Sequence, residues 1–119
     1  MTFDEYQAEA IKTSICPDVY IKDKDGNFIL VPAIYPVLGL AGEASEVSEK
    51  FKKVMRDKGG NISGEDVDLI TKELGDVIWY VSAICHYMGL SFDDVAKLNI
   101  EKLKSRRERG MISGSGDLR

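Results

Sequence analysis

The sequence contains few of the residues that most metal and redox sites in proteins use. Its 119 residues include one histidine and two cysteines. Cys16 and Cys85 lie far apart in the chain and match no metal-ligand or redox spacing. We therefore expect no disulfide framework, and unpaired thiols of this kind are typical of the reducing cytoplasm.

The chain also lacks a basic excess and a long hydrophobic run. It has 16 Lys and Arg residues against 20 Asp and Glu residues, a net charge of −4, whereas nucleic-acid-binding proteins are usually strongly basic. The most apolar stretch, 77–88, is too short to span a bilayer, and residues 1–10 lack the features of a signal peptide. We expect a cytoplasmic protein whose partners are neither a membrane nor a nucleic-acid polymer.

The spacing of the apolar residues predicts an all-α fold. Four helices are expected, over residues 2–15, 36–58, 63–88 and 91–110. Gly59 and Gly60 end the second helix. Ser63 and Ser91 are N-cap residues, each followed by an aspartate three positions later, which is a variant of the capping box. The segment 18–33 is either a short β-hairpin or a packed loop.

A chain of this length forms one domain, which we assign to residues 1–110. The remaining residues, 111–119, are rich in Gly and Ser and form a C-terminal tail. The third helix is apolar nearly all round between Val77 and Met88, so it needs burial on several sides. One short chain does not readily supply that burial. We therefore expect an antiparallel bundle of about four helices per chain that assembles as an oligomer.

Acidic residues recur at helical spacing on the second and third helices. Glu43, Glu46 and Glu49 follow one another at steps of three, and Glu73 and Asp76 are also three apart. Such neighbours are roughly 5–6 Å apart at Cβ. Because apolar residues flank both groups, we expect them to face each other across the packing seam, where carboxylates are costly without a cation. Oxygen ligands favour magnesium or manganese. The alternative is that these are ordinary solvated charges.

Polar and basic residues form a second group on the fourth helix. Asn99, Lys102 and Arg106 lie at steps of three and four, on one helical face. Their amide, ammonium and guanidinium groups suit phosphate oxygens and a sugar hydroxyl. Cations near a helix C-terminus are also favoured by the helix dipole alone. Both interpretations of this group remain open at the level of the sequence.

Several of these motifs occur together in the order typical of one family. The segments Glu43-Ala-Ser-Glu46 and Glu73-Leu-Gly-Asp76 read E-x-x-E and E-x-x-D, the second within ELGD-x-x-WY, and the fourth helix carries N-x-x-KL-x-x-R. In this respect the chain resembles the MazG-like, all-α nucleoside-triphosphate pyrophosphohydrolases. The similarity covers most of the chain apart from residues 16–33. Ser45 stands where the family's pattern usually has glycine.

The resemblance implies an enzyme that hydrolyses nucleoside triphosphates, foremost deoxynucleotides, to the monophosphate and pyrophosphate. Water would attack the α-phosphorus, in a homodimer or homotetramer that serves nucleotide-pool housekeeping. The implied magnesium ligands, for which manganese is an alternative ion, are Glu43, Glu46, Glu73 and Asp76. Glu46 is the first candidate for the residue that accepts the water's proton, and Glu49 is the second.

The resemblance also suggests substrate contacts. Asn99 and Lys102 match the family's phosphate-binding motif, and Arg106 and Lys53 are weaker candidates. Tyr80 and Gln7 are candidates for contact with the sugar or base. Trp79 is a further candidate on the base side, although a role in the core is favoured for it. Two alternatives from other functional classes are a non-catalytic helical partner protein and a nucleic-acid-binding module that uses the fourth helix.

Overall fold

The computed structural model describes all residues, 1–119, and contains four helices and one small sheet. The helices are α1 (Phe3–Ala10), α2 (Ile34–Lys58), α3 (Gly64–Tyr87) and α4 (Phe92–Glu108), and a 3₁₀ turn, η1 (Ile11–Thr13), continues α1. Strands β1 (Tyr20–Lys22) and β2 (Phe28–Leu30) pair antiparallel. The all-α fold class with four helices is confirmed, and the segment 18–33 forms the hairpin rather than a packed loop.

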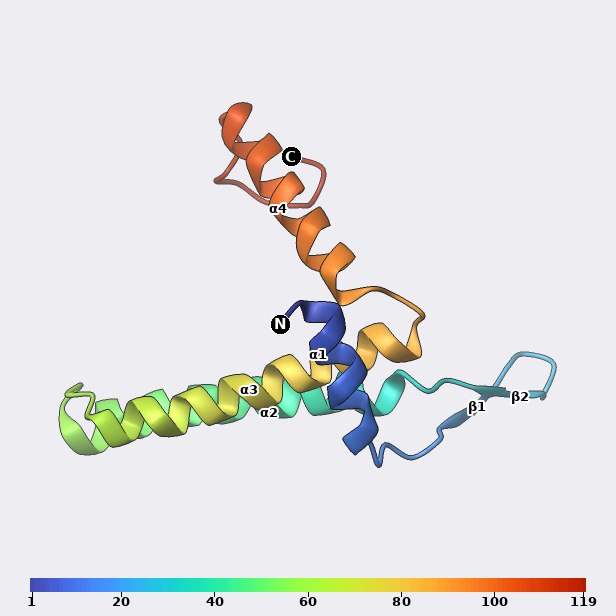
Figure 1. Cartoon of the computed structure of the whole chain (residues 1–119), viewed down its shortest axis with the longest axis horizontal. Coiled ribbons are helices and arrows are strands. Elements are labelled where there is room, and N and C mark those ends of the chain that lie inside the picture. The colour runs from blue at the N-terminus through green and yellow to red at the C-terminus, as the bar shows by residue number, and fades with distance from the viewer.

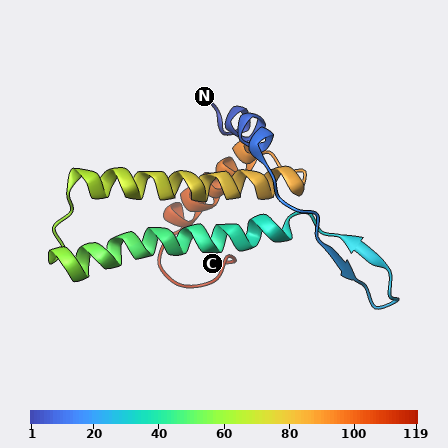
Figure 2. The ribbon, with the colours of Figure 1, turned by 90° about the horizontal axis from the view of Figure 1, so that it is seen from below.

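Helices α2 and α3 form a long antiparallel hairpin, which is the largest unit of the chain (Figures 1 and 2). Gly59 and Gly60 connect them with φ angles of 59° and 86°, a left-handed conformation that suits glycine. Ser63 caps α3: its side chain accepts a hydrogen bond from the Asp66 N–H, and the Asp66 side chain accepts one from the Ser63 N–H. The sequence signals therefore place this turn correctly.

Helix α1 and turn η1 pack across α3. The indole Nε1 of Trp79 donates to the Ala10 carbonyl at 3.2 Å and to Thr13 Oγ1 at 3.0 Å. The helical segment ends at Thr13, two residues before the predicted end, because Ser14 is extended. The Ser14 hydroxyl makes a 2.7 Å hydrogen bond with the Tyr87 hydroxyl, so the chain turns away from α1 at this point.

Helix α4 leaves the end of α3 and projects away from the α2–α3 hairpin (Figure 1). Its N-terminus is attached to α1. The Gln7 amide donates to the Leu90 carbonyl and accepts from the Phe92 N–H, both at 3.0 Å. The Phe3 and Phe92 rings stack at a centroid distance of 4.5 Å. These contacts with α1, rather than contacts with α2, set the direction of α4.

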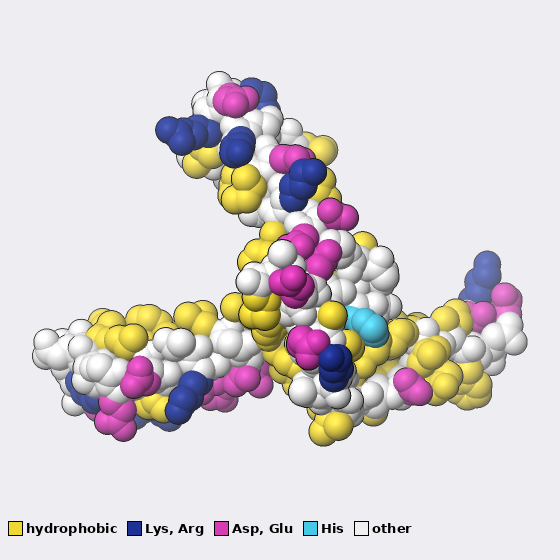
Figure 3. Space-filling model, in the orientation of Figure 1, with side chains coloured by type: hydrophobic (Ala, Val, Ile, Leu, Met, Phe, Trp, Pro, Cys, Tyr) yellow, Lys and Arg dark blue, Asp and Glu magenta, His cyan; other side chains and the backbone are white.

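The buried core of the single chain is small, since only 10 of 119 residues are buried. Large apolar side chains remain exposed on α2, α3 and α4, among them Leu38 at 67%, Val67 at 52% and Leu98 at 64%. Figure 3 shows hydrophobic side chains along one edge of the α2–α3 hairpin and on the projecting β-hairpin. None of the helices has the length and apolar character needed to cross a membrane.

Candidate active site

Three carboxylates meet where α2 faces α3. One oxygen each from Glu43, Glu73 and Asp76 lies within 4.8 Å of the others. Glu43 and Glu73 are half-buried and Asp76 is exposed. Oxygen ligands around one magnesium ion are separated by up to ~4 Å, so a small adjustment of these side chains would accommodate the ion. We call these three residues the carboxylate cluster.

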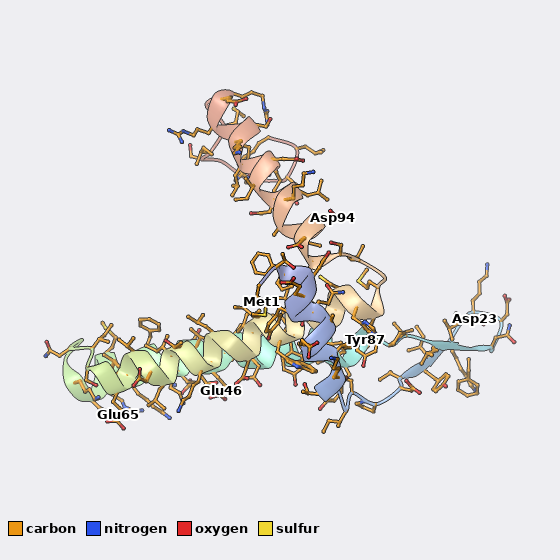
Figure 4. All side chains as sticks on the ribbon, viewed as in Figure 1. Met1, Asp23, Glu46, Glu65, Tyr87 and Asp94 are labelled. Atoms are coloured by element: carbon orange, nitrogen blue, oxygen red, sulfur yellow. The ribbon has the colours of Figure 1, made fainter.

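Glu46, the fourth acidic residue of the motif, lies outside the carboxylate cluster. Its side chain is exposed, on the edge of the hairpin that faces downward in Figure 4. Its charge still reaches the cluster, because it contributes to a raised pKa of Glu43. The structure therefore brings together three of the four ligands suggested by the sequence, and Glu46 lies apart from them.

The carboxylate cluster carries negative charge that the protein balances only in part. Partial burial raises the pKa of Glu43, and the negative charges of Asp76, Glu73 and Glu46 raise it further. One cation opposes them: Lys50 Nζ lies 3.1 Å from Glu73 Oε1. Crowded carboxylates with oxygen-only donors fit a hard divalent cation such as magnesium or manganese, which would relieve the mutual repulsion.

Lys50 contacts the carboxylate cluster, although the sequence motifs did not identify it as part of the site. Its side chain and that of Glu73 are only 25% and 18% exposed, so this ion pair is less screened by water than the surface pairs. The residue lies seven positions after Glu43, which is two helical turns on the same face of α2. That spacing is the signal that could have identified it.

A cleft of about 460 Å³ opens beside the carboxylate cluster. Its walls come from the chain after α1, from α2 and from α3, and they combine acidic with apolar and aromatic side chains. The lining residues are Thr13, Ile15, Cys16, Tyr35, Glu43, Asp76, Trp79 and Tyr80. The volume lies within the range of small-molecule sites, and carboxylates at one side of an aromatic cleft can serve a charged, ring-containing ligand.

Tyr80 and Trp79 form the aromatic wall of this cleft. Their rings meet edge to face, with centroids 5.0 Å apart and an interplanar angle of 84°. Partial burial raises the pKa of the Tyr80 hydroxyl, and the neighbouring Tyr35 and Glu43 raise it further. Trp79 is held by its hydrogen bonds to Ala10 and Thr13, so it is both a packing residue and part of the cleft wall.

Other residues suggested by the sequence lie elsewhere. The Gln7 amide is engaged with Leu90 and Phe92 and does not line the cleft. Glu49 pairs with Lys52 at 2.7 Å, and this hydrogen bond lowers the pKa of Glu49. Lys53 is exposed on α2.

The polar face of α4 is separated from the carboxylate cluster within one chain. Asn99 and Lys102 line a shallow groove of about 310 Å³ on α4. Arg106 is only 4% exposed, because the tail 111–119 folds back over it. Asp117 of the tail accepts hydrogen bonds from both Lys102 and Arg106 at 3.1 Å. These basic groups are therefore occupied by the protein's own carboxylate.

Comparison with known proteins gives a consistent result. The chain is 40% identical over 120 residues to the Gene 37 protein of Mycobacterium phage L5, and the match covers all of both chains. No solved structure gives a significant match. The sequence profile of the MazG nucleotide pyrophosphohydrolase domain matches residues 36–111, which include nearly all of α2, the whole of α3 and α4, and all three members of the carboxylate cluster. The chain belongs to the MazG nucleotide pyrophosphohydrolase family.

Proposed function

We propose that this protein hydrolyses nucleoside triphosphates, foremost deoxynucleotides, to nucleoside monophosphate and pyrophosphate in a magnesium-dependent reaction. The observation that carries the proposal is the carboxylate cluster beside an aromatic cleft of about 460 Å³. The cleft accommodates the nucleoside, and the cluster lies where the phosphates would emerge from it. The role we propose is nucleotide-pool housekeeping in the cytoplasm, which fits two free thiols.

The proposed metal ligands are Glu43, Glu73 and Asp76, together with Glu46 once its exposed side chain turns toward them. When bound there, magnesium supplies charge neutralisation for the phosphate oxygens and lowers the pKa of water. Lys50 has to share the Glu73 carboxylate with the ion or move aside, because it already pairs with one of its two oxygens. Manganese has the same preference for oxygen ligands and is the expected substitute.

In the proposed reaction a water oxygen attacks the α-phosphorus, the bond from that phosphorus to the bridging oxygen breaks, and pyrophosphate leaves. Glu46 accepts the water's proton, because it lies outside the carboxylate cluster and is the proposed ligand least committed to the metal. Glu49 is the weaker candidate, since Lys52 holds it in an ion pair and lowers its pKa. A carboxylate with a lowered pKa is a poorer proton acceptor.

We propose that Tyr80 contacts the sugar or the base of the substrate. Lys53 and, on α4, Asn99, Lys102 and Arg106 are the proposed phosphate contacts. Gln7 remains a weaker candidate, because its amide is already engaged. Helix α4 contacts α1 rather than the carboxylate cluster.

Because α4 lies away from the cluster of its own chain, we also propose that a homodimer or homotetramer brings α4 of one chain to the cluster of another. The exposed apolar residues of α2–α4 support such an assembly. Light scattering on the purified protein tests it, and a monomer at micromolar concentration would contradict it.

The decisive experiment incubates the protein with magnesium and a panel of ribo- and deoxynucleoside triphosphates and identifies the products. We expect monophosphate and pyrophosphate, no turnover in the presence of a metal chelator, and higher kcat/KM for deoxynucleotides. Diphosphate and phosphate as products would rule out attack at the α-phosphorus. No turnover of any substrate would favour the alternative of a non-catalytic helical partner protein.

A further inference from the structure

Gly39 and Tyr80 occupy matching positions on the two helices of the hairpin. Gly39 lies one turn before Glu43 on α2, and Tyr80 lies one turn after Asp76 on α3. Because α2 and α3 run antiparallel, Gly39 faces Tyr80 just as Glu43 faces Asp76. A Cβ atom on residue 39 would come within 2.6 Å of Tyr80 Cδ1 and would overlap Cε1 and Cζ. The ring of Tyr80 therefore lies directly against the backbone of α2, in space that only glycine leaves free.

A glycine inside a helix destabilises it by about 1 kcal/mol relative to alanine. Helix α2 contains a second glycine, Gly42, where an added Cβ atom would meet nothing within 4 Å. The two glycines are three residues apart in the same helix, so they differ chiefly in the atoms that a side chain at each position would meet. At Gly39 that neighbour is a residue of the cleft wall, and at Gly42 it is open space.

We propose that Gly39 is a positioning residue for the substrate: it lets the Tyr80 ring lie close against the backbone of α2 and so sets the cleft wall beside the carboxylate cluster. This inference rests on the proposed function, in which Tyr80 contacts the nucleoside. With alanine at position 39 the ring has to leave this position, and the cleft wall that it forms changes. The change weakens nucleoside binding without touching a proposed metal ligand.

The test compares Gly39→Ala with Gly42→Ala. We expect Gly39→Ala to raise KM roughly tenfold with a smaller change in kcat, because uniform binding of the substrate is lost. Gly42→Ala leaves both constants unchanged. Magnesium binding, measured by calorimetry, stays the same in both variants. Equal KM values for the two variants would overturn the proposal.

Two further measurements separate a moved ring from a damaged fold. Trp79 is the chain's only tryptophan, and its ring contacts the Tyr80 ring. Its fluorescence therefore reports on the position of the Tyr80 ring without any substrate. We expect altered emission in Gly39→Ala and native emission in Gly42→Ala. In a Tyr80→Ala background, Gly39→Ala has no further effect on KM, since the ring is already gone. Additive effects on KM, or native emission in Gly39→Ala, would contradict the proposal even if the wild-type reaction is confirmed.

An independent observation concerns the C-terminal tail. The Asp117 carboxylate lies between Lys102 Nζ and Arg106 Nη2, at 3.1 Å from each, and the carbonyls of Gly116 and Asp117 also accept from Arg106. The Arg106 guanidinium is buried, and its Nε has no partner. A carboxylate held by an ammonium and a guanidinium occupies the space that a phosphate oxygen would need.

We infer that the tail is an autoinhibitory contact: Asp117 competes with the phosphates of the substrate for Lys102 and Arg106. This second inference rests on the proposed phosphate-binding role of those two residues. The competition is weak, because the Asp117 side chain is 83% exposed and such ion pairs contribute little in water. A magnesium-bound triphosphate carries more charge than one carboxylate and can therefore displace the tail.

Asp117→Asn in the full chain tests this inference, with Asp68→Asn, an exposed α3 residue that carries the same charge change, as the control. We expect Asp117→Asn to bind inorganic pyrophosphate, measured by calorimetry, about two- to fivefold more tightly than the control, as an exposed ion pair allows. KM falls by a similar factor and kcat is unchanged. Equal or weaker binding by Asp117→Asn would refute the inhibitory role of the tail. Because pyrophosphate binding needs no turnover, this result is independent of the reaction products.

Discussion

The α2–α3 hairpin contains two groups of carboxylates with opposite surroundings. Near the turn, Asp66 is 9% exposed and accepts hydrogen bonds from Lys58 Nζ at 2.8 and 2.9 Å and from the Ser63 N–H at 2.9 Å. These donors lower the pKa of Asp66 to about 2. At the carboxylate cluster, partial burial raises the pKa of Glu43, and the neighbouring carboxylates raise it further.

The difference separates a structural carboxylate from a ligand-binding one on the same pair of helices. Donors around Asp66 stabilise its charged form, so this residue contributes to folding. Partial burial and the neighbouring carboxylates disfavour the charged form of Glu43, so the cluster costs stability until a cation binds. We therefore expect substitutions at the two ends of the hairpin to have separable effects, on folding near the turn and on metal binding and turnover at the cluster.

The largest expected effect is on turnover. Glu46→Gln removes the proposed proton acceptor and keeps its shape, so kcat falls about 10²–10⁴-fold, the usual cost of losing a general base. Glu65→Gln, at the other end of the hairpin (Figure 4), makes the same change of charge and leaves kcat unaltered. Steady-state kinetics with magnesium measure both. A larger loss in Glu49→Gln than in Glu46→Gln would identify Glu49 as the base instead.

The next effect is on the stabilisation that magnesium provides. At a magnesium concentration a hundredfold above Kd, an ion that binds only the folded protein stabilises it by about 2.7 kcal/mol. We expect Asp76→Asn to abolish most of this gain in thermal melts, because it removes one member of the carboxylate cluster. Asp66→Asn melts at a lower temperature without metal but keeps the full magnesium-dependent gain. A retained gain in Asp76→Asn would place the metal elsewhere.

Local signals explain how much of this arrangement was predictable from the sequence. The turn after α2 and the cap of α3 follow from Gly59, Gly60 and Ser63, which act on their immediate neighbours. Once the turn is fixed, the antiparallel register brings Glu43 opposite Asp76. The carboxylate cluster could therefore be predicted from the helical spacing of its residues and from the one turn that connects α2 to α3.

Features that depend on distant contacts could not be predicted in this way. The cleft wall at Ile15 and Cys16 exists because η1 packs on α3, and no motif marks these two residues. The direction of α4 depends on the contacts of Gln7 with Leu90 and with Phe92, the first residue of α4. The tail carries no pattern from which its return to Arg106 could be foreseen. Spacing within an element predicts which residues share a face, but not which other element covers that face.

A smaller effect is expected from the cap near the turn. Ser63→Ala removes the side chain that accepts from the Asp66 N–H and one donor to the Asp66 carboxylate. Loss of such an N-cap costs about 1 kcal/mol. Chemical denaturation measures this loss, and magnesium affinity and kcat remain those of the wild type. A change in magnesium affinity would show that the two ends of the hairpin are coupled after all.

The opposite pKa shifts also predict opposite pH dependences of stability, without metal. The pKa of Asp66 is lowered from 3.8 to about 2 in the folded state, so its contribution is full above about pH 4 and is lost as the pH falls toward 2. The pKa of Glu43 is raised above 4.5, so its protonated form stabilises the fold, and that contribution is lost as the pH rises through the raised value. Magnesium needs the charged carboxylate, so its affinity falls over the same interval as the pH is lowered.

Melting curves with a chelator, taken across this pH range, test both statements. Asp66→Asn reduces the loss of stability that occurs as the pH falls below about 4. Glu43→Gln removes the loss of stability that occurs as the pH rises toward neutrality and leaves the loss in acid unchanged. If Glu43→Gln destabilised the metal-free protein at neutral pH, its carboxylate would be a structural group like Asp66. The distinction between the two ends of the hairpin would then fail, because both carboxylates would stabilise the folded protein.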